Sequence, residues 1–162
     1  MPDVTPCAVP QGALLQRYVG LAGCYTDCFE VTLPGTVALP AFISAFYTTW
    51  LFRLERAVLT CLLRRRIRDS DVAALASGAA NQFAAWTVEA RQADQILLCD
   101  LAGHTRSFLA VERMADAGTK VLFGSAVAPS KSGDLGRGVK AMAPLHRFYS
   151  SSLLRAACHK LP

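Results

Sequence analysis

Residues 83–128 read FAAWTVEARQADQILLCDLAGHTRSFLAVERMADAGTKVLFGSAVA, and most of the predicted sheet comes from this segment. It is rich in apolar, aromatic and β-branched residues, and short turn-forming links interrupt it at Ala93-Asp94, at Ala102-Gly103 and at residues 116–118. This pattern predicts four strands, over residues 83–91, 95–101, 104–113 and 120–128. Because links this short join neighbouring strands as hairpins, we expect an antiparallel sheet.

The residues before this stretch predict one more strand and two helices. The segment YTDCFEVTL, residues 25–33, is rich in β-forming residues and is followed by a Pro-Gly pair, which is typical of a strand and a turn. Apolar residues then recur every three or four positions from about residue 39 to 66, which predicts a long amphipathic helix. A short helix is expected over residues 71–76, with Ser70 as its N-cap and Gly78 as its stop.

The residues after this stretch predict a long closing helix over residues 139–159. Its apolar stripe is formed by Val139, Met142, His146, Tyr149, Leu153 and Ala157. Pro144 lies inside the helix and is expected to kink it or to mark its first turn. The predicted fold class is α+β, with a curved antiparallel sheet wrapped on the long C-terminal helix, because this arrangement buries the helical stripes. We expect a single domain over residues 21–162, preceded by an irregular arm over residues 1–20 that carries three prolines.

Composition and cysteine content are typical of a folded, reduced protein. The 162 residues are 52% hydrophobic and 18% charged, which fits one globular domain and does not fit a disordered chain. The N-terminus, MPDVTPCAVPQG, lacks the basic and apolar regions of a signal peptide, so we expect a cytoplasmic protein whose six cysteines stay reduced. Only Cys24 and Cys28 lie close together, and no second Cys or His pair at zinc spacing follows them. No metal site and no cofactor are therefore predicted.

Charge and hydropathy bear on two classes of partner. A net charge of +5 can attract nucleic acid, but the densest basic cluster, Arg64 to Arg66 with Arg68, ends a predicted helix, where cations complement the helix dipole. No nucleic-acid-binding motif accompanies the cluster, so we do not expect nucleic acid as the partner. Residues 31–52 carry no charge, but prolines and a glycine interrupt them, and we expect no membrane span. The sequence leaves the possibility of an oligomer open.

A family resemblance is carried by the segments YTDCF, LLCDLAGHTRSFLAVE, GSAV and LGRGVKAMAPLHRFYSSSLLR. Together they resemble an uncharacterised bacterial domain family placed near the helix-grip superfamily, which includes START-like lipid-transfer proteins and polyketide cyclases. The resemblance spans residues 25–161 and implies a sheet that grips the C-terminal helix, with a hydrophobic cavity between them for ligand binding. It implies no reaction, because the relatives include carriers, cyclases and regulators. A full helix-grip fold has seven strands, whereas the pattern above predicts five.

The predicted sheet offers a first set of candidate site residues. With a two- or four-residue loop at the Ala-Gly turn, strand parity places on one face Leu97, Cys99, Leu101, His104, Arg106, Phe108 and Glu112. If that face lines the cavity, His104 can act as an acid or base and Arg106 can bind an anion, with Glu112 orienting the guanidinium group. The alternative is that His104 and Arg106 lie at an exposed hairpin end.

The closing helix and the first long strand offer a second set. His146 lies on the apolar stripe, so its imidazole faces the sheet, where it contacts a ligand or bonds a backbone carbonyl. A bond to a backbone carbonyl is the commoner case for a buried histidine, and the Pro-x-His-Arg pattern of residues 144–147, which recurs in the family, adds support to the ligand alternative. Tyr25 and Asp27 place a phenol and a carboxylate on one strand face, as a polar rim of the cavity or as decoration of a sheet edge. Trp86 is either a cavity wall or plain core.

Three functions are compatible with these residues. The first is a binding domain for a small hydrophobic molecule, which would contact Trp86, Arg106, Phe108, Glu112, Met142 and Tyr149. The second is a cyclase- or isomerase-type enzyme, whose catalytic candidates are His146, His104, Tyr25 and Asp27. The third is a protein or nucleic-acid interaction module that uses the basic helix end at residues 64–68.

Overall fold

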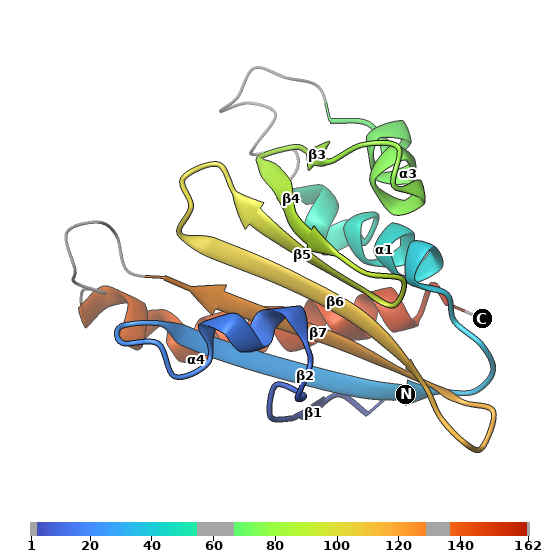
Figure 1. Cartoon of the computed structure of the whole chain (residues 1–162), viewed down its shortest axis with the longest axis horizontal. Coiled ribbons are helices and arrows are strands. Elements are labelled where there is room, and N and C mark those ends of the chain that lie inside the picture. The colour runs from blue at the N-terminus through green and yellow to red at the C-terminus, as the bar shows by residue number, and fades with distance from the viewer. Residues whose placement is uncertain (1–2, 55–66, 129–136, 162) are drawn as a thin grey trace.

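The structure is a computed structural model that describes residues 3–54, 67–128 and 137–161, with the backbone alone for residues 137–143. Within these residues the fold is α+β, with a seven-stranded antiparallel sheet in the order β1-β2-β7-β6-β5-β4-β3 (Figure 1). The long strands are β2 (Tyr25–Leu33), β4 (Trp86–Arg91), β5 (Gln95–Asp100), β6 (Thr105–Arg113) and β7 (Thr119–Val127). Two-residue strands, β1 (Thr5–Pro6) and β3 (Gln82–Phe83), form the edges, so the sheet stays open. The predicted antiparallel sheet and long C-terminal helix are confirmed.

One predicted strand, over residues 83–91, is divided in two. Phe83 of β3 pairs with Trp86 of β4, so Ala84 and Ala85 form the two-residue turn of a tight hairpin. Ala84 has a positive φ of 53°, a conformation that such turns need and that a continuous strand excludes. Two alanines carry none of the usual glycine or asparagine signals for this turn, which is why the sequence pattern missed it.

The predicted helix over residues 39–66 is interrupted after two turns. Helix α1 (Leu39–Tyr47) ends at Thr48, and residues 50–54 are helical again. Thr49 causes the restart, because its Oγ1 accepts a hydrogen bond of 3.2 Å from the Phe52 backbone N–H, which is the bond of an N-cap residue. Threonine hydroxyls compete with the helix backbone in this way, whereas the apolar spacing continues through the break. Residues 55–66 of the prediction lie outside the described residues.

The remaining helices lie close to their predicted positions. Helix α3 (Asp69–Ser77) ends at Gly78, whose φ of 80° confirms it as the stop. Its N-cap is Arg68 and not Ser70, because the Asp71 carboxylate accepts a hydrogen bond of 2.8 Å from the Arg68 backbone N–H. Helix α4 (Arg137–Cys158) runs through its internal proline without ending. None of the described helices is long and apolar enough to cross a membrane.

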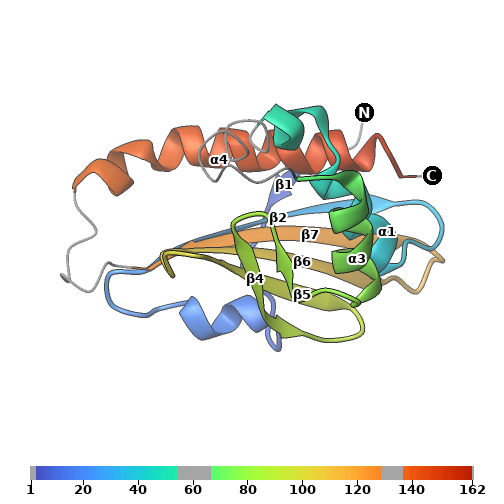
Figure 2. The same cartoon turned by 90° about the horizontal axis from the view of Figure 1, so that it is seen from above.

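The sheet has a covered layer on each side. Figure 2 shows α4 along one face and the blue N-terminal helical turn η1 (Leu14–Tyr18) against the other. The α4 face holds the larger hydrophobic cluster, which also contains the apolar side chains of α1 and α3. The η1 face holds a smaller cluster of Leu15, Cys28, Leu97, Phe108, Ala110, Leu122 and Ala126. Neighbouring residues of one strand therefore face different cores.

The N-terminal arm is an integral layer of the fold and not the irregular segment that we predicted for residues 1–20. Residues 5 and 6 pair with β2, and the Leu15 side chain of η1 is completely buried. The Leu14 backbone N–H donates a hydrogen bond of 2.7 Å to Gln95 Oε1 of β5, which ties the helical turn to the sheet. A strand of two residues and a single helical turn are too short to produce a periodic pattern, so the prediction overlooked both.

Candidate functional site

A cavity of about 380 Å³ lies between the sheet and α4. This volume is within the range of small-molecule sites. Its walls are mainly aromatic and aliphatic, and the residues that line it are Phe46, Phe52, Trp86, Thr105, Arg106, Ser107, Phe123, Ser125, His146, Tyr149, Ser150 and Leu153. Of the residues that the sequence predicts for the site, the cavity is lined by Trp86, Arg106, His146 and Tyr149. Aromatic walls with a few polar atoms are typical of a site for a largely apolar molecule.

Four polar side chains from three elements meet at one side of this cavity. Tyr25 and Asp27 lie two residues apart on β2, and Asp27 is paired directly with Ser125 of β7, so all three project from the same face of the sheet. His146 of α4 completes the group, with its Nε2 2.7 Å from Ser125 Oγ and 3.7 Å from Asp27 Oδ2. The edge of the His146 ring also faces Tyr25, with 6.2 Å between the ring centroids. We call these residues the polar cluster.

Asp27 is the acceptor at the centre of the polar cluster. Its Oδ1 accepts hydrogen bonds from the Ser125 hydroxyl at 2.6 Å and from the Ser125 backbone N–H at 3.2 Å. Its Oδ2 accepts a third from the Tyr25 hydroxyl at 3.2 Å. Only 6% of the Asp27 side chain is exposed, so these bonds replace the water that a carboxylate would otherwise bind.

The protons available in the polar cluster determine which group donates in the hydrogen bond between Ser125 and His146. Because Asp27 as a carboxylate can only accept, the single hydroxyl proton of Ser125 goes to Asp27. Ser125 Oγ must then accept from His146, which therefore carries a proton on Nε2. In a hydrolytic triad the histidine lies between the aspartate and the serine and takes the serine proton. Here the serine lies between the other two, so the cluster does not activate Ser125 as a nucleophile.

Burial, followed by the neighbouring Asp27 carboxylate, raises the pKa of Tyr25 to about 12. The neutral phenol is thus favoured in the folded state, where it donates to Asp27. Since the unfolded value is about 10, the stabilisation is fully present below pH 10 and is lost as the pH rises towards 12.

We expect the unfolding free energy of the wild type to fall more steeply between pH 10 and 12 than that of Tyr25→Phe. Denaturant unfolding at a series of pH values measures both slopes, and the absorbance of tyrosinate gives the pKa directly. The difference between wild type and variant isolates Tyr25 from the other tyrosines. Equal slopes, or a Tyr25 pKa near 10, would contradict the structure.

A second polar feature of the cavity is the Ser150 hydroxyl. Ser150 of α4 lies directly behind the cavity wall, where it is completely buried, and its Oγ has no hydrogen-bond partner among the described protein atoms. The other two buried serines of the wall are paired, Ser125 within the polar cluster and Ser107 of β6 with the Tyr47 hydroxyl at 3.0 Å. An unpaired buried hydroxyl is uncommon and calls for an explanation in each case.

An apolar groove adjoins the cavity and is formed by α4 together with residues 50 and 51. It has a volume of about 690 Å³ and is lined by Trp50, Leu51, Leu145, His146, Phe148, Tyr149 and Ser152. Trp50 and Phe148 are 69% and 70% exposed, which is high for side chains of this size. Because His146 and Tyr149 line both spaces, they stand between the groove and the cavity.

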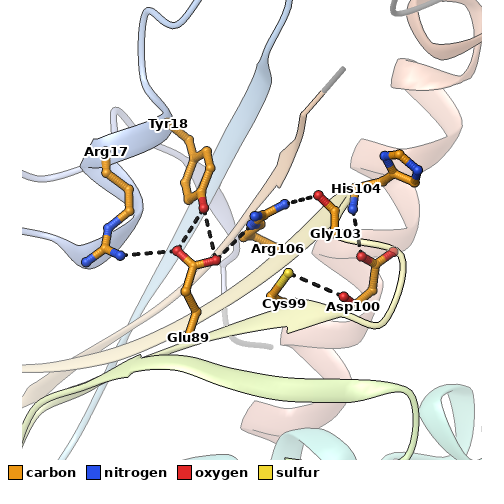
Figure 3. Close-up of polar contacts among 8 residues, drawn as sticks. All are labelled: Arg17, Tyr18, Glu89, Cys99, Asp100, Gly103, His104 and Arg106. Atoms are coloured by element: carbon orange, nitrogen blue, oxygen red, sulfur yellow. Dashed lines mark hydrogen bonds and ion pairs between the residues drawn. The ribbon is translucent and has the colours of Figure 1, made fainter. Parts of the chain in front are cut away.

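The opposite face of the sheet carries a separate polar group, shown in Figure 3. Arg106 donates to Glu89 at 3.0 Å, and its guanidinium lies 4.7 Å from the centre of the Tyr18 ring. Tyr18 and Arg17 of η1 also bond to Glu89, at 2.7 and 3.1 Å. These contacts attach η1 to the sheet, so the guanidinium of Arg106 is already occupied within the fold.

Several predicted site residues therefore lie away from the polar cluster. The register confirms that Cys99 and Arg106 share a face, but that face is the one covered by η1, and Phe108 belongs to the core beneath it. Glu112 lies 3.8 Å from Lys120 and does not orient Arg106, because Glu89 does so. The orienting role predicted for Glu112 was wrong.

His104 is also remote from the polar cluster. The His104 backbone N–H donates a hydrogen bond of 2.7 Å to Asp100 Oδ1 within the β5–β6 turn. The His104 ring points away from Glu89 in Figure 3. It is not among the residues that line the cavity. The side chain of Met142 and the basic residues 64–66 lie outside what the structure describes.

Three of the four catalytic candidates, Tyr25, Asp27 and His146, are brought together. The sequence reasoning missed Ser125 and Ser150, and the signal for Ser125 was its position as the one hydroxyl in the apolar run VLFGSAV. In the described part of the chain, no group of three or more His, Cys, Asp or Glu side chains is placed to hold a metal ion. No protein-family model matches the chain, and no curated protein matches it either.

Proposed function

We propose that this protein binds a small, largely apolar molecule in the cavity between the sheet and α4. The observation that carries the proposal is a space of about 380 Å³ between the sheet and α4, lined by aromatic side chains and by residues that carry hydroxyl groups. Phe46, Phe52 and Phe123 supply apolar contact area, while Ser125 and His146 supply polar atoms. A molecule held in this way gains from burial of its apolar surface and is oriented by its polar part.

We also propose that the fold is related to the helix-grip fold. A helix-grip-like arrangement is supported by the open antiparallel sheet, by the long helix that follows it, and by the position of the cavity between the two. The strand count of seven removes the departure expected from the sequence, although β1 and β3 contain only two residues each. The adjoining groove provides the mouth of the cavity, since His146 and Tyr149 line both.

The two tryptophans of the chain allow a direct test. Trp86 lines the cavity and Trp50 lines the groove, so each single-tryptophan variant reports on one space. We expect a brominated alkane chain, 1-bromodecane, to quench the emission of Trp50→Phe, in which Trp86 alone remains. The matched variant Trp86→Phe reports binding in the groove. Quenching confined to Trp86→Phe, or absent from both variants, would refute the proposed cavity site.

An enzyme that moves protons is a second candidate, and one observation favours it. His146 is 32% exposed, lines the cavity and is oriented by Ser125 and Asp27, as a histidine that serves as acid or base must be. Such an enzyme would exchange the hydrogens next to a carbonyl group. Incubation of 2-decanone with the protein in heavy water would show uptake of deuterium that His146→Gln abolishes. No uptake above the background rate would leave a binding protein without this activity.

A further inference from the structure

Two cysteines lie opposite each other where the N-terminal arm meets the sheet. The last pair of the β1–β2 register is Pro6 with Phe29, and the next residues along the two segments are Cys7 and Cys28. The Cys7 backbone N–H donates a hydrogen bond of 2.9 Å to the Cys28 carbonyl oxygen, so the pairing continues past the end of β1. Opposed residues of antiparallel strands project their side chains to the same face of a sheet, so the two thiols are neighbours.

The spacing of such a pair suits a disulfide bond. Opposed residues joined by backbone hydrogen bonds have Cα atoms about 5.5 Å apart, and disulfides form over Cα separations of about 4.4–6.8 Å. The Cβ atoms of such a pair are roughly 4.5–5.5 Å apart, against roughly 3.5–4.5 Å in an unstrained disulfide. Strand β1 has two residues and forms an edge of the sheet, so a small shift of the arm closes this difference. A bond that keeps some strain is more easily reduced again.

The surroundings give the two thiols different reactivities. Cys28 is 3% exposed and belongs to the core beneath η1, whereas Cys7 packs against that core and is partly exposed. A hydrogen bond with the Cys28 thiol lowers the pKa of Cys7 by more than burial raises it. The same hydrogen bond, followed by burial, raises the pKa of Cys28. Because thiolates and not thiols react with oxidants, Cys7 is the sulfur that an oxidant attacks first.

We propose that hydrogen peroxide converts Cys7 and Cys28 into a reversible disulfide, which fastens the N-terminal arm to β2. The Cys7 thiolate attacks one peroxide oxygen and becomes a sulfenic acid, while the other oxygen leaves as hydroxide and combines with the proton that the Cys7 thiol had released. The Cys28 sulfur then attacks the Cys7 sulfur and displaces the sulfenic oxygen as hydroxide, which takes up the Cys28 proton. Two thiols thus lose two electrons, and one peroxide is reduced to two waters.

The disulfide acts on the layer that covers the second face of the sheet. The bond closes a loop of roughly 20 residues, and this loop contains η1, whose Leu15 side chain is completely buried against the sheet. Closing the loop restricts the unfolded chain and therefore stabilises the folded arm. Both thiols belong to the η1 face, whereas the cavity lies between the other face and α4. The proposal is therefore independent of the proposed ligand site.

Peptide mapping tests whether the bond forms. The full chain is treated with an equimolar amount of hydrogen peroxide, the remaining thiols are alkylated with N-ethylmaleimide, and trypsin and chymotrypsin digest the protein. Chymotrypsin cuts after Tyr25 and so separates Cys24 from Cys28. We expect mass spectrometry to find two peptides joined through Cys7 and Cys28, which dithiothreitol separates. The matched control Cys24→Ser, which removes another partly exposed thiol, should give the same pair.

Melting temperatures test whether the bond stabilises the arm. The oxidised wild type should melt about 5 °C above the reduced protein, and Cys24→Ser should show the same difference. Cys7→Ser should show none, and circular dichroism confirms that this variant is folded, as expected for a change at a partly exposed position. A disulfide from Cys7 or Cys28 to any other cysteine or to a second chain, or oxidation of Cys7 without a disulfide, would overturn the proposal. The same holds if Cys7→Ser keeps the rise in melting temperature, or if the bond forms without one.

Discussion

Replacement of Asp27 by alanine should lower the free energy of unfolding by about 3 kcal/mol. The carboxylate accepts three hydrogen bonds from Ser125 and Tyr25, and bonds to a charged group contribute roughly 1.5–3 kcal/mol each before any compensation. The alanine removes the acceptor of the Ser125 and Tyr25 hydroxyl groups in the polar cluster, where water can replace only part of the loss. Denaturant unfolding monitored by circular dichroism measures the change.

The same substitution should also weaken ligand binding in the cavity. Without Asp27, the Ser125 hydroxyl is free to donate to His146, so the His146 ring loses both its fixed proton and its fixed orientation. Tyr25→Phe is the control, because it removes a single hydrogen bond from the same carboxylate and should cost about 1 kcal/mol. If Asp27→Ala is no more destabilising than Tyr25→Phe, Asp27 is not the centre of the polar cluster.

The long elements could be predicted from the sequence because their local signals agree with the final fold. The strand over residues 25–33 has its predicted bounds, since a β-rich run ends at a Pro-Gly turn. Helix α4 differs from its predicted bounds by two residues at the start and one at the end. The predictions were wrong where a local interaction interrupts an element while the apolar pattern of the sequence continues. The Thr49 hydroxyl restarts a helix in this way, and the Ala84-Ala85 turn divides a strand.

The second layer could have been anticipated from one strand. Strand β5 contains the continuous run Ile96, Leu97 and Leu98, all of them completely buried, rather than an alternation of apolar and polar residues. A run of this kind indicates a strand that is covered on both faces. The covering element is η1 in the arm that we expected to be irregular, and this explains why Phe108 lies in the core beneath η1 and the Arg106 guanidinium contacts Tyr18.

The candidate site could be predicted only in part, because it depends on which strands pair in the sheet and in which register. Tyr25, Asp27 and His146 were identified from chemistry and helical spacing, but Ser125 becomes significant only when β7 is paired with β2. The register that places Ser125 opposite Asp27 depends on contacts between residues almost a hundred positions apart. Ser150 is recognisable only once the cavity is known, since a serine in a helix is ordinarily unremarkable.

Gly124→Ala is the second substitution for which we expect a large effect, a loss of about 3 kcal/mol in the free energy of unfolding. Gly124 lies in β7 with an ordinary strand conformation, so the effect is steric and does not depend on backbone freedom. A Cβ at this position would lie 2.6 Å from Leu15 Cδ2 and 2.9 Å from the Asp27 carbonyl oxygen. Overpacking in a core costs roughly 1–3 kcal/mol, and a backbone oxygen cannot move aside as a side chain can.

The double variant Gly124→Ala with Leu15→Ala identifies which contact dominates. Leu15→Ala alone should cost about 2–5 kcal/mol, because Leu15 is completely buried between η1 and the sheet. If the leucine were the only obstacle, the two changes together would cost less than their sum by more than 1 kcal/mol. We expect the double variant to recover less than about 1 kcal/mol relative to this sum, because the Asp27 carbonyl remains in place. We also expect Gly124→Ala to weaken ligand binding, because displacement of β2 at this point moves the Asp27 carboxylate away from Ser125. An unchanged stability for Gly124→Ala, measured by denaturant unfolding, would mean that the η1 layer does not pack on β7 as the structure has it.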